Sequence, residues 1–209
     1  MQYLRRFLPY FMLSGALAAF LYLYHVVAGG LLWPGYSHLM EPISNLTAAG
    51  APDRDFLLLI TNAYSAFALF FSLLFFAFYA YNYGKLVFLG ALCLLILETI
   101  SLAYGFFPED LPGAVATFNG KMHIIVTMLI VPFTIISPLL LGLGFRKFEI
   151  WKKFAGYSVI TSVLIVIFGS LSAIFYIGNL PFFGLVERLN IGSLQLWLTI
   201  FSLKIYKTV

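Results

Sequence analysis

The stretch WPGYSHLMEPISNLTAAGAPDRD, residues 33–55, is a long polar segment between two long apolar ones. Residues 9–32 precede it as one continuous apolar run, and residues 56–81 follow it as another. Each run exceeds the roughly 20 residues that an α-helix needs to cross a bilayer. We therefore predict a membrane-spanning helix on either side of a polar connection that lies beside the membrane.

The composition extends this interpretation to the whole chain. Of the 209 residues, 62% are hydrophobic and only 10% are charged, whereas a soluble domain has roughly 25% charged residues. The length accommodates about six spans of roughly 20 residues with short connections. We predict an all-α integral membrane bundle of six transmembrane helices, forming one domain over residues 1–209. Cys93 is the only cysteine, which excludes an intramolecular disulfide.

Four further apolar runs complete the predicted bundle, at residues 86–107, 122–145, 154–177 and 189–206. The tight turn at residues 82–85 makes the second and third helices a helical hairpin. Pro132 and Pro138 lie inside the fourth run. Proline removes backbone hydrogen bonds, so we expect this helix to be kinked and packed among its neighbours.

An alternative exists for the first apolar run. Arg5 and Arg6 precede it, and the residues Ala16, Leu17 and Ala18 imitate the small-residue cleavage site of a secretory signal peptide. The run continues well past that point, which favours a membrane span.

The basic residues indicate the orientation of the bundle, because short cytoplasmic loops retain lysine and arginine. Alternation of six spans places nine of the twelve on one side: Arg5, Arg6, Lys85, Arg146, Lys147, Lys152, Lys153, Lys204 and Lys207. We therefore expect both termini to be cytoplasmic in a cell membrane. The net charge of +4 then follows from topology. No basic stripe of the kind that binds nucleic acid is present, so membrane lipids are the expected partners.

All three histidines fall on the predicted outer side. His38 is in the first outer loop, while His25 and His123 lie near outer helix ends. Six of the eight acidic residues share this side: Glu41, Asp53, Asp55, Glu109, Asp110 and Glu187. Any chemistry is therefore expected at the outer face.

Four motifs carry a resemblance to a known family: GYSHLMEPISNLTAAGAP at 35–52, FFPED at 106–110, GKMH at 120–123 and GLVERLNIG at 184–192. In these motifs and their order the chain resembles the prokaryotic multi-pass membrane family catalogued as domain of unknown function 998. The resemblance implies a six-span membrane protein. Members of that family commonly have an acidic residue where Asn45 stands, so no catalytic carboxylate is assumed there. The family name implies no reaction, and function must be argued from the site.

The first candidate site is the outer loop itself. If residues 37–46 form a helical turn, Glu41 reaches Ser44 and Asn45 at three- and four-residue spacing, and Ser37 caps the turn. Serine, histidine and glutamate can act as nucleophile, base and orienting group. The alternative, which we favour, is a capped turn that seals the outer mouth of the bundle, because a triad is defined by geometry.

A metal site is the second possibility. His25, His38, His123 and a carboxylate are the residue types from which a catalytic zinc takes its three protein ligands. No paired spacing such as H-x-x-x-H supports it. We predict no metal and no cofactor, and expect these histidines to bond loop backbone groups.

Glu98 is the third candidate, because an acid within a span is costly and usually faces the bundle interior. It precedes Phe107 by nine residues, which places it roughly 13 Å below that helix end. It could carry a proton or form the floor of a polar pocket. Equally, it could be a protonated carboxyl bonded to Ser101, Thr127 or Thr134, and both alternatives remain open.

The length of the outer loop and the spacing of its apolar residues predict that it forms a lid. It is longer than the two to eight residues that usually join adjacent helices. Its apolar residues Leu39, Met40, Ile43 and Leu46 recur at helical spacing, so one face can enter the bundle mouth. We expect Glu41 and His123 to share a pocket there, with further ligand-binding candidates in His38, Asn45 and Glu109.

Two classes of function fit these observations. One is a small membrane enzyme that acts on a lipid head group or lipid-linked molecule, with Glu41 and His123 as acid and base. The other is a non-enzymatic small-solute transporter or a partner in a membrane complex. Few polar residues lie within the spans, which argues against transport, and no known catalytic constellation is present. Glu187 and Arg188, just before the last span, are expected to form a local ion pair that anchors the helix.

Overall fold

The computed structural model describes residues 2–208 of the chain and the side chains of residues 6–208. All regular structure within that range is helical, so the predicted all-α class is confirmed. The α-helices are α1 Gln2–Phe11, α2 Ser14–Leu32, α3 Arg54–Phe78, α4 Lys85–Ser101, α5 Phe118–Phe145, α6 Lys152–Ile177 and α7 Phe183–Thr208. Four short 3-10 helices join them: η1 Ile43–Thr47, η2 Ala80–Tyr83, η3 Leu102–Gly105 and η4 Glu149–Trp151.

Five helical segments of the described chain are long and apolar enough to cross a membrane: Arg6–Leu32, Arg54–Phe78, Lys85–Gly105, Phe118–Phe145 and Glu149–Ile177. They coincide with the first five predicted spans. The sixth predicted span corresponds to α7, which is of similar length but includes Asn190, Gln195 and Lys204. These polar residues lower its hydropathy, and the predicted count of six spans is not confirmed.

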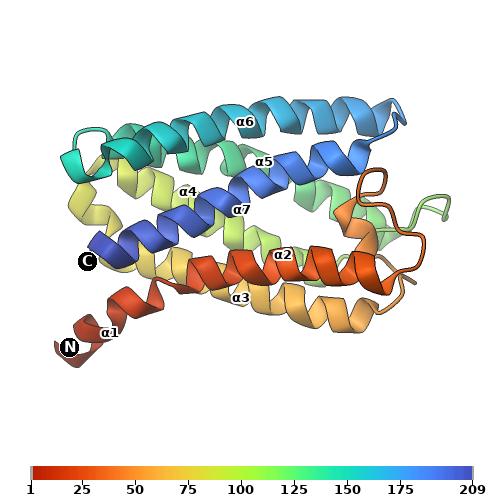
Figure 1. The fold of residues 1–209 in the computed structure, drawn as a ribbon, viewed down its shortest axis with the longest axis horizontal. Helices are drawn as coiled ribbons and strands as arrows, with labels where there is room; N and C mark the ends of the chain where they lie inside the picture. Colours follow the sequence, from red (N-terminus) through yellow and green to blue (C-terminus); the bar gives the residue numbers. More distant parts are fainter. Residues whose placement is uncertain (1, 209) are drawn as a thin grey trace.

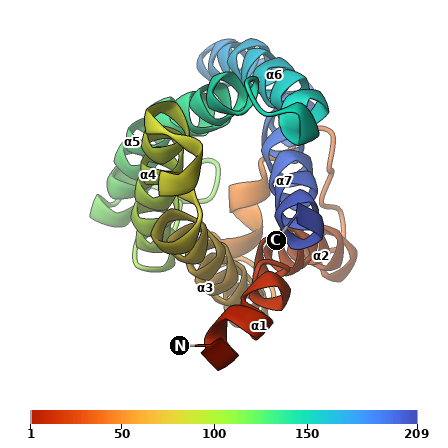
Figure 2. The same ribbon diagram turned by 90° about the vertical axis from the view of Figure 1, so that its left-hand side faces the viewer.

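The six helices α2 to α7 form a closed ring (Figure 2). Each packs against the next in the chain, and α7 packs back against α2. Both chain termini lie at one end of the ring, and the long connection between α2 and α3 lies at the other (Figure 1). We refer to these as the terminal end and the loop end.

The first predicted span is interrupted near its start. The structure has a short helix α1, which contains Pro9, and a break at Met12 and Leu13 before α2. At the break the hydroxyl of Ser202 donates to the carbonyl of Met12 (2.6 Å) and accepts from the N–H of Ala16 (3.0 Å). An α-helix would join those two backbone groups directly. The side chain of Ser202 is inserted into the backbone ladder, a recognised cause of helix bending.

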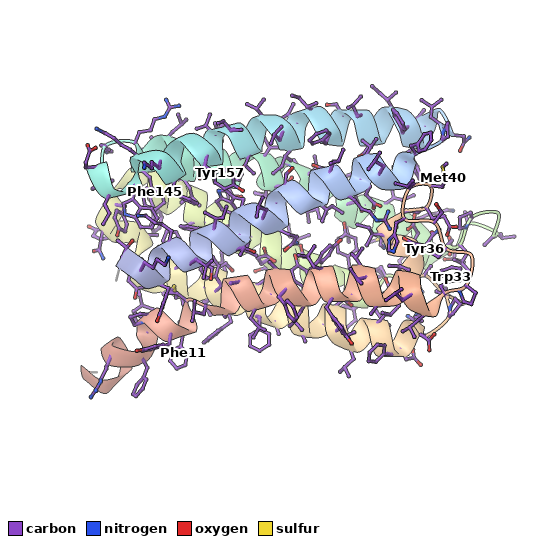
Figure 3. The ribbon with its side chains drawn as sticks, viewed as in Figure 1. Phe11, Trp33, Tyr36, Met40, Phe145 and Tyr157 are labelled. Atoms are coloured by element: carbon purple, nitrogen blue, oxygen red, sulfur yellow. The ribbon has the colours of Figure 1, made fainter. Side chains whose placement is uncertain are left out.

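Aromatic side chains fill the interior of the ring at its terminal end, where Figure 3 labels Phe145. Phe145 stacks on Trp151 with ring centroids 4.3 Å apart, and Phe75 meets Phe201 edge-on at 4.8 Å. All four side chains are fully buried. Such rings bury large apolar areas and add geometric specificity to the packing. This aromatic core fixes one end of the ring.

Glycines allow α4 and α5 to approach each other closely. A Cβ added at Gly90 would lie 2.9 Å from the backbone nitrogen of Leu141, and one at Gly144 would lie 2.9 Å from that of Val87. Small residues at such contacts are the usual basis of helix packing in membranes. Helix α5 continues as one element through both of its prolines.

Candidate functional site

The connection between α2 and α3 closes the loop end of the ring. Its first part turns at residues 37–41, where the N–H of Glu41 donates to the carbonyl of Ser37 (2.9 Å). Pro42 is extended (φ −64°, ψ 152°), and η1 begins after it. The segment 37–46 is therefore not one helical turn, because Pro42 separates two turns. The expected cap is also reversed: the backbone N–H of Ser37 donates to the carboxylate of Glu41 (3.4 Å).

Arg188, near the start of α7, holds this loop through two of its oxygen atoms and also bonds a carbonyl of its own helix. One terminal nitrogen donates to the carbonyl of Glu41 (2.8 Å) and to that of Gly184 (2.9 Å). The other donates to the hydroxyl of Tyr36 (2.6 Å), which itself donates to the carbonyl of Pro42 (2.8 Å). The guanidinium carbon also lies 5.6 Å from the centre of the Tyr36 ring. A planar, multiply donating group is suited to this task in a way that lysine is not.

Glu187 holds the same loop as a hydrogen-bond acceptor. Its carboxylate accepts from the backbone N–H of Ile43 (2.7 Å). The expected ion pair between Glu187 and Arg188 does not form among the described residues, where the ion pairs are Arg54 with Asp55 and Lys152 with Glu149. Neighbouring side chains on a helix point in different directions. We call Glu187 and Arg188 together the loop clamp.

The backbone at the start of α7 completes the attachment. The N–H of Gly184 donates to the carbonyl of Met40 (3.3 Å), and that of Leu185 donates to the carbonyl of Leu39 (3.0 Å). Four N–H groups at a helix start lack a partner within the helix, and the loop accepts from two of them. A Cβ at Gly184 would overlap the carbonyl oxygen of Glu41, so the approach requires glycine.

His38 is fixed against α2. A Cβ at Gly30 would overlap its imidazole, and its ring meets that of Tyr36 edge-on at 5.3 Å. Burial and the nearby charge of Arg188 lower the pKa of His38. Burial raises the pKa of Tyr36 to about 12, against the opposing effect of Arg188. Both groups are therefore neutral at pH 7.

Helix η1 lies inside the ring at the loop end (Figure 2). Ile43, Asn45 and Leu46 are buried there, while Ser44 is half-buried. Leu46 packs against Gly29 of α2 and joins a small apolar cluster with Leu57. Figure 3 shows Trp33, Tyr36 and Met40 at this end. The loop thus covers the mouth of the ring with apolar contacts as well as hydrogen bonds.

Beneath the loop the interior becomes polar. The side-chain N–H of Gln195 in α7 donates to the hydroxyl of Tyr64 in α3 (3.1 Å). The ring of Tyr64 meets that of Tyr22 edge-on at 5.0 Å, and Tyr22 meets His25 at 5.8 Å. Helices α3 and α7 are not neighbours in the ring, so the bond between them crosses the interior.

Glu98 belongs to the same region, since it is close enough for its charge to act on the Tyr64 hydroxyl. We call Tyr22, His25, Tyr64, Glu98 and Gln195 the interior polar cluster. Glu98 lies within one turn of the end of α4 and is 3% exposed. The α-helix ends at Ser101 and η3 continues the helical segment to Gly105, so Glu98 is slightly nearer its end than the expected end at Phe107 implies.

The hydrogen-bond partners expected for Glu98 are all engaged elsewhere. Ser101 donates to the carbonyl of Leu97 (2.8 Å), and Thr134 donates to that of Val131 (2.7 Å). Thr127 donates to the carbonyl of His123 (2.9 Å) and also meets the hydroxyl of Tyr104 (2.8 Å). Short polar side chains in helices commonly bond their own backbone in this way. None of the three bonds Glu98 in the structure, so this alternative finds no support there.

Several buried polar atoms of the interior polar cluster have no hydrogen-bond partner among the described residues. They are one carboxyl oxygen of Glu98, the side-chain oxygen of Gln195 and both ring nitrogens of His25. Gln195 is 3% exposed and His25 is 2% exposed. Buried polar atoms in folded proteins nearly always have a partner. Unpaired buried atoms occur elsewhere too, such as the hydroxyl of Ser137 and the indole N–H of Trp151, but this region combines a carboxyl, an amide and an imidazole.

The two residues proposed to share a pocket have separate partners. A ring nitrogen of His123 lies 3.0 Å from the carbonyl of Phe107, and its ring lies 4.7 Å from that of Tyr104. The carboxylate of Glu41 accepts from Ser37. The pocket shared by Glu41 and His123 stays a prediction, as do the catalytic candidates among the loop residues.

The connection between η3 and α5 reaches the loop through Glu109, whose carbonyl accepts from the N–H of Ala49 (2.9 Å). One carboxyl oxygen of Glu109 is buried without a hydrogen-bond partner. Next to it, Asp110 accepts from the N–H (2.8 Å) and the hydroxyl (2.7 Å) of Thr117. These two hydrogen bonds lower the pKa of Asp110. Thr117 in turn caps α5 by accepting from Gly120.

Within the described chain no three histidine, cysteine, aspartate or glutamate side chains are grouped so as to hold a metal ion. Sequence reasoning did not include Arg188, Gln195 or Tyr64 among the site residues. A polar residue inside an apolar run was the signal that singled out Glu98. The same signal applies to Gln195 in the last run.

The fold and this region define an all-helical membrane protein whose ring of helices encloses polar groups at one end. Residues 16–204 match the family model described as Protein of unknown function (DUF998), and the chain belongs to that family. The resemblance carried by the four motifs is therefore confirmed. No curated protein and no solved structure matches the chain. The description of the family assigns no activity, so the function rests on the geometry.

Proposed function

We propose that the protein binds the polar head of a lipid or lipid-linked molecule at the loop end of the ring. The unpaired buried atoms of Glu98, Gln195 and His25 carry this proposal. Leaving such a group without a partner costs about 1–3 kcal/mol. A bound polar group that supplies the missing hydrogen bonds would remove that cost, which gives the apo protein a driving force for binding.

A lipid fits the surroundings of this region. The outside of the ring is apolar: on α5 alone, Ile125, Met128 and Leu129 are exposed. A molecule with a polar head and an apolar tail can place the head between the helices while the tail stays in the bilayer. Polar groups inside a membrane bundle usually mark a binding site or pathway.

The orientation that we propose makes the loop end the outer face. Six helices, α2 to α7, would cross the cell membrane as one domain with both termini in the cytoplasm. Basic residues support this, because Lys85 begins α4, Arg146 follows α5 and Lys152 begins α6, all at the terminal end. Cytoplasmic loops are enriched in such residues. The location of both termini at that end also fits an even number of crossings (Figure 1).

We further propose that residues 33–53 act as a lid over the site. The loop clamp holds the lid closed, and Ile43 and Leu46 close the mouth beneath it. Opening requires the first turn of α7 to release the loop, and also the loss of the Ala49–Glu109 hydrogen bond and of the packing of His38 and Leu46 against α2. A lid explains how a head group can reach atoms that are buried in the closed structure.

Native mass spectrometry of protein purified in mild detergent tests the proposal. Wild type should retain lipid at a defined stoichiometry, and Glu98→Leu should lose it. Ser137→Ala is the matched control, because the Ser137 hydroxyl is also buried and unpaired but lies outside the interior polar cluster. If Glu98→Leu does not fold, His25→Leu replaces it. Equal lipid retention by wild type and the cluster variants would contradict the proposal.

A further inference from the structure

The loop-end interior carries more acidic than basic groups. Three carboxyl groups, those of Glu98, Glu109 and Glu187, are associated with this region, and Arg188 is the neighbouring arginine. Arg188 already donates to three loop and helix oxygens. The carboxyls of Glu98 and Glu109 each keep one buried oxygen without a hydrogen-bond partner in the described chain. This excess of acidic groups favours the binding of a ligand with a cationic group over one with an anionic group, since unlike charges attract strongly at low dielectric.

The free oxygens of the interior polar cluster are hydrogen-bond acceptors, while His25 offers one donor and one acceptor nitrogen when neutral. The amide nitrogen of Gln195 is committed to Tyr64, which leaves its oxygen as the free atom. The free oxygen of Glu98 also accepts when the carboxyl is ionised. A ligand that satisfies both must donate, as N–H groups do. A phosphate, which only accepts when fully ionised, does not match these atoms.

Aromatic rings lie beside these acceptors. The rings of Tyr22 and Tyr64 meet edge-on at 5.0 Å, and the Tyr64 hydroxyl is within range of the charge of Glu98. Both tyrosines are half-buried and keep accessible surface. Aromatic faces combined with a carboxylate are the common means by which proteins recognise ammonium groups, through cation–π attraction.

We propose that the group bound by the interior polar cluster is a protonated primary amine. Glu98 acts as its counter-ion, the oxygen of Gln195 accepts a second N–H, and the rings of Tyr22 and Tyr64 lie at its sides. The inference rests on the proposed lipid-binding function and names the head-group chemistry. The amine belongs to a lipid head group or to a free amine, and both present the same ammonium.

Lipid nanodiscs of defined composition test this assignment. Wild-type protein is placed in discs of phosphatidylglycerol containing a minor fraction of phosphatidylethanolamine, phosphatidylcholine or neither, and the melting temperature and the retained lipid are measured. A further arm adds free ethanolamine to discs of phosphatidylglycerol alone. Only phosphatidylethanolamine should raise the melting temperature if the amine is lipid-borne, whereas an increase with free ethanolamine identifies a soluble amine.

The variant that decides the role of the carboxylate is Glu98→Gln, which keeps the shape but removes the charge. We expect it to lose about tenfold or more of the preference for phosphatidylethanolamine over phosphatidylglycerol, since one charge-assisted bond is lost. Glu149→Gln makes the same change at an exposed acid of the terminal end and should leave the preference intact. Gln195→Met, which removes the second acceptor, should weaken the preference if Glu98→Gln does not fold.

The outcomes separate the two proposals. Retention of the amine preference in Glu98→Gln, or a preference for phosphatidylglycerol in wild type, would overturn the ammonium site while leaving lipid binding in place. If wild type retains no more lipid of any kind than Glu98→Leu does, lipid binding itself is overturned, and the ammonium site with it.

Discussion

The two ends of the ring interior differ in the kind of side chain that they bury. At the terminal end aromatic rings such as Phe145 and Trp151 stack closely and Trp197 donates to Ser158 (2.9 Å), although the indole N–H of Trp151 has no hydrogen-bond partner in the described chain. At the loop end three polar side chains, Glu98, His25 and Gln195, are buried together and each keeps an unpaired atom. The same six helices enclose both regions. Packing at one end can therefore hold the ring together while the other end remains available for a ligand.

Because of this difference, substitutions at the two ends should change the stability of the protein in opposite directions. A side chain removed from the aromatic core leaves a cavity, which costs stability. A polar side chain removed from the interior polar cluster takes away an unsatisfied group, which can raise the stability of the free protein. Strain or unmet bonding at a site is typical where function and stability compete.

Phe201→Ala should produce the largest effect. Phe201 is fully buried and meets Phe75, Trp151 and Phe154. We expect a loss of about 3–5 kcal/mol in the free energy of unfolding, as for other buried phenylalanines. Reversible unfolding in a denaturing detergent measures it. Phe20→Ala, at a position that is 62% exposed on the outside of the ring, is the control and should change little.

Arg188→Ala should release the loop without opening the ring. The substitution removes the hydrogen bonds to Glu41, Tyr36 and Gly184, so we expect a local loss of about 2–3 kcal/mol. Hydrogen exchange of residues 36–43 should accelerate strongly, while the exchange of α4 stays unchanged. Arg188→Lys should restore only part of the protection, because lysine lacks the planar donor array. Unchanged exchange in 36–43 would show that Arg188 does not hold the loop.

Gly184→Ala should disturb the same loop from the backbone side. The added methyl overlaps the carbonyl of Glu41, and we expect a loss of about 1–3 kcal/mol from the forced shift. The matched control is Gly192→Ala on the same helix, where no atom lies within 4 Å of the new Cβ. That change should be neutral or stabilise α7 by up to about 1 kcal/mol, since alanine favours helix more than glycine does. Similar melting temperatures for the two variants would contradict the close approach at Gly184.

Glu98→Leu should stabilise the protein in detergent without added amine lipid. Glu98 has an unpaired buried oxygen, and its removal should add about 1 kcal/mol to the free energy of unfolding. Ser158→Ala at the terminal end should instead destabilise by about 1 kcal/mol, because it leaves the indole N–H of Trp197 without an acceptor. Melting temperatures of both variants, compared with wild type, show whether the first is stabilised and the second destabilised. A loss of stability in Glu98→Leu would show that Glu98 is satisfied in the free protein.

Asp110 should give the smallest effect, visible only at low pH. The hydrogen bonds from Thr117 lower the pKa of Asp110 below its ordinary value of 3.8. A carboxyl whose folded-state pKa is depressed contributes stability above its unfolded-state pKa and loses it as the pH falls through the folded-state pKa. The melting temperature of wild type should thus fall below about pH 4 relative to Asp110→Asn, and the two should run in parallel above it.

The helices could be predicted from the sequence because hydropathy is a local property. The run 154–177 lies within two residues of α6 at its start and coincides with it at its end. The break after α1 could not be predicted, since the hydroxyl that causes it comes from Ser202, 190 residues away from Met12. The apolar side chains around Met12 are compatible with a continuous helix and with a broken one.

The sequence directed attention to the loop end, and of its candidates Glu98 is part of the interior polar cluster. Most of the other candidate side chains were taken from the loop, because its polar residues are close together in sequence. The bonds that fix the loop come from residues 144 to 152 positions away, such as Glu187 to Ile43 and Arg188 to Tyr36. Nothing in a local pattern distinguishes Arg188 bonded to backbone carbonyls from Arg188 paired with its neighbour.

The Ser202 hydroxyl of α7 bridges two backbone groups at the start of α2, and this affects the order in which the fold is assembled. Helix α7 is made after the other helices of the ring, yet it supplies Ser202 at one end of the ring, the loop clamp at the other and Gln195 between them. Chains fold from the N-terminus as they are made. The start of α2 therefore reaches its final backbone geometry only after α7 has been made and has packed against it. The attachment of the loop and the interior polar cluster are completed in the same step, so a nascent chain lacks both until α7 is in place.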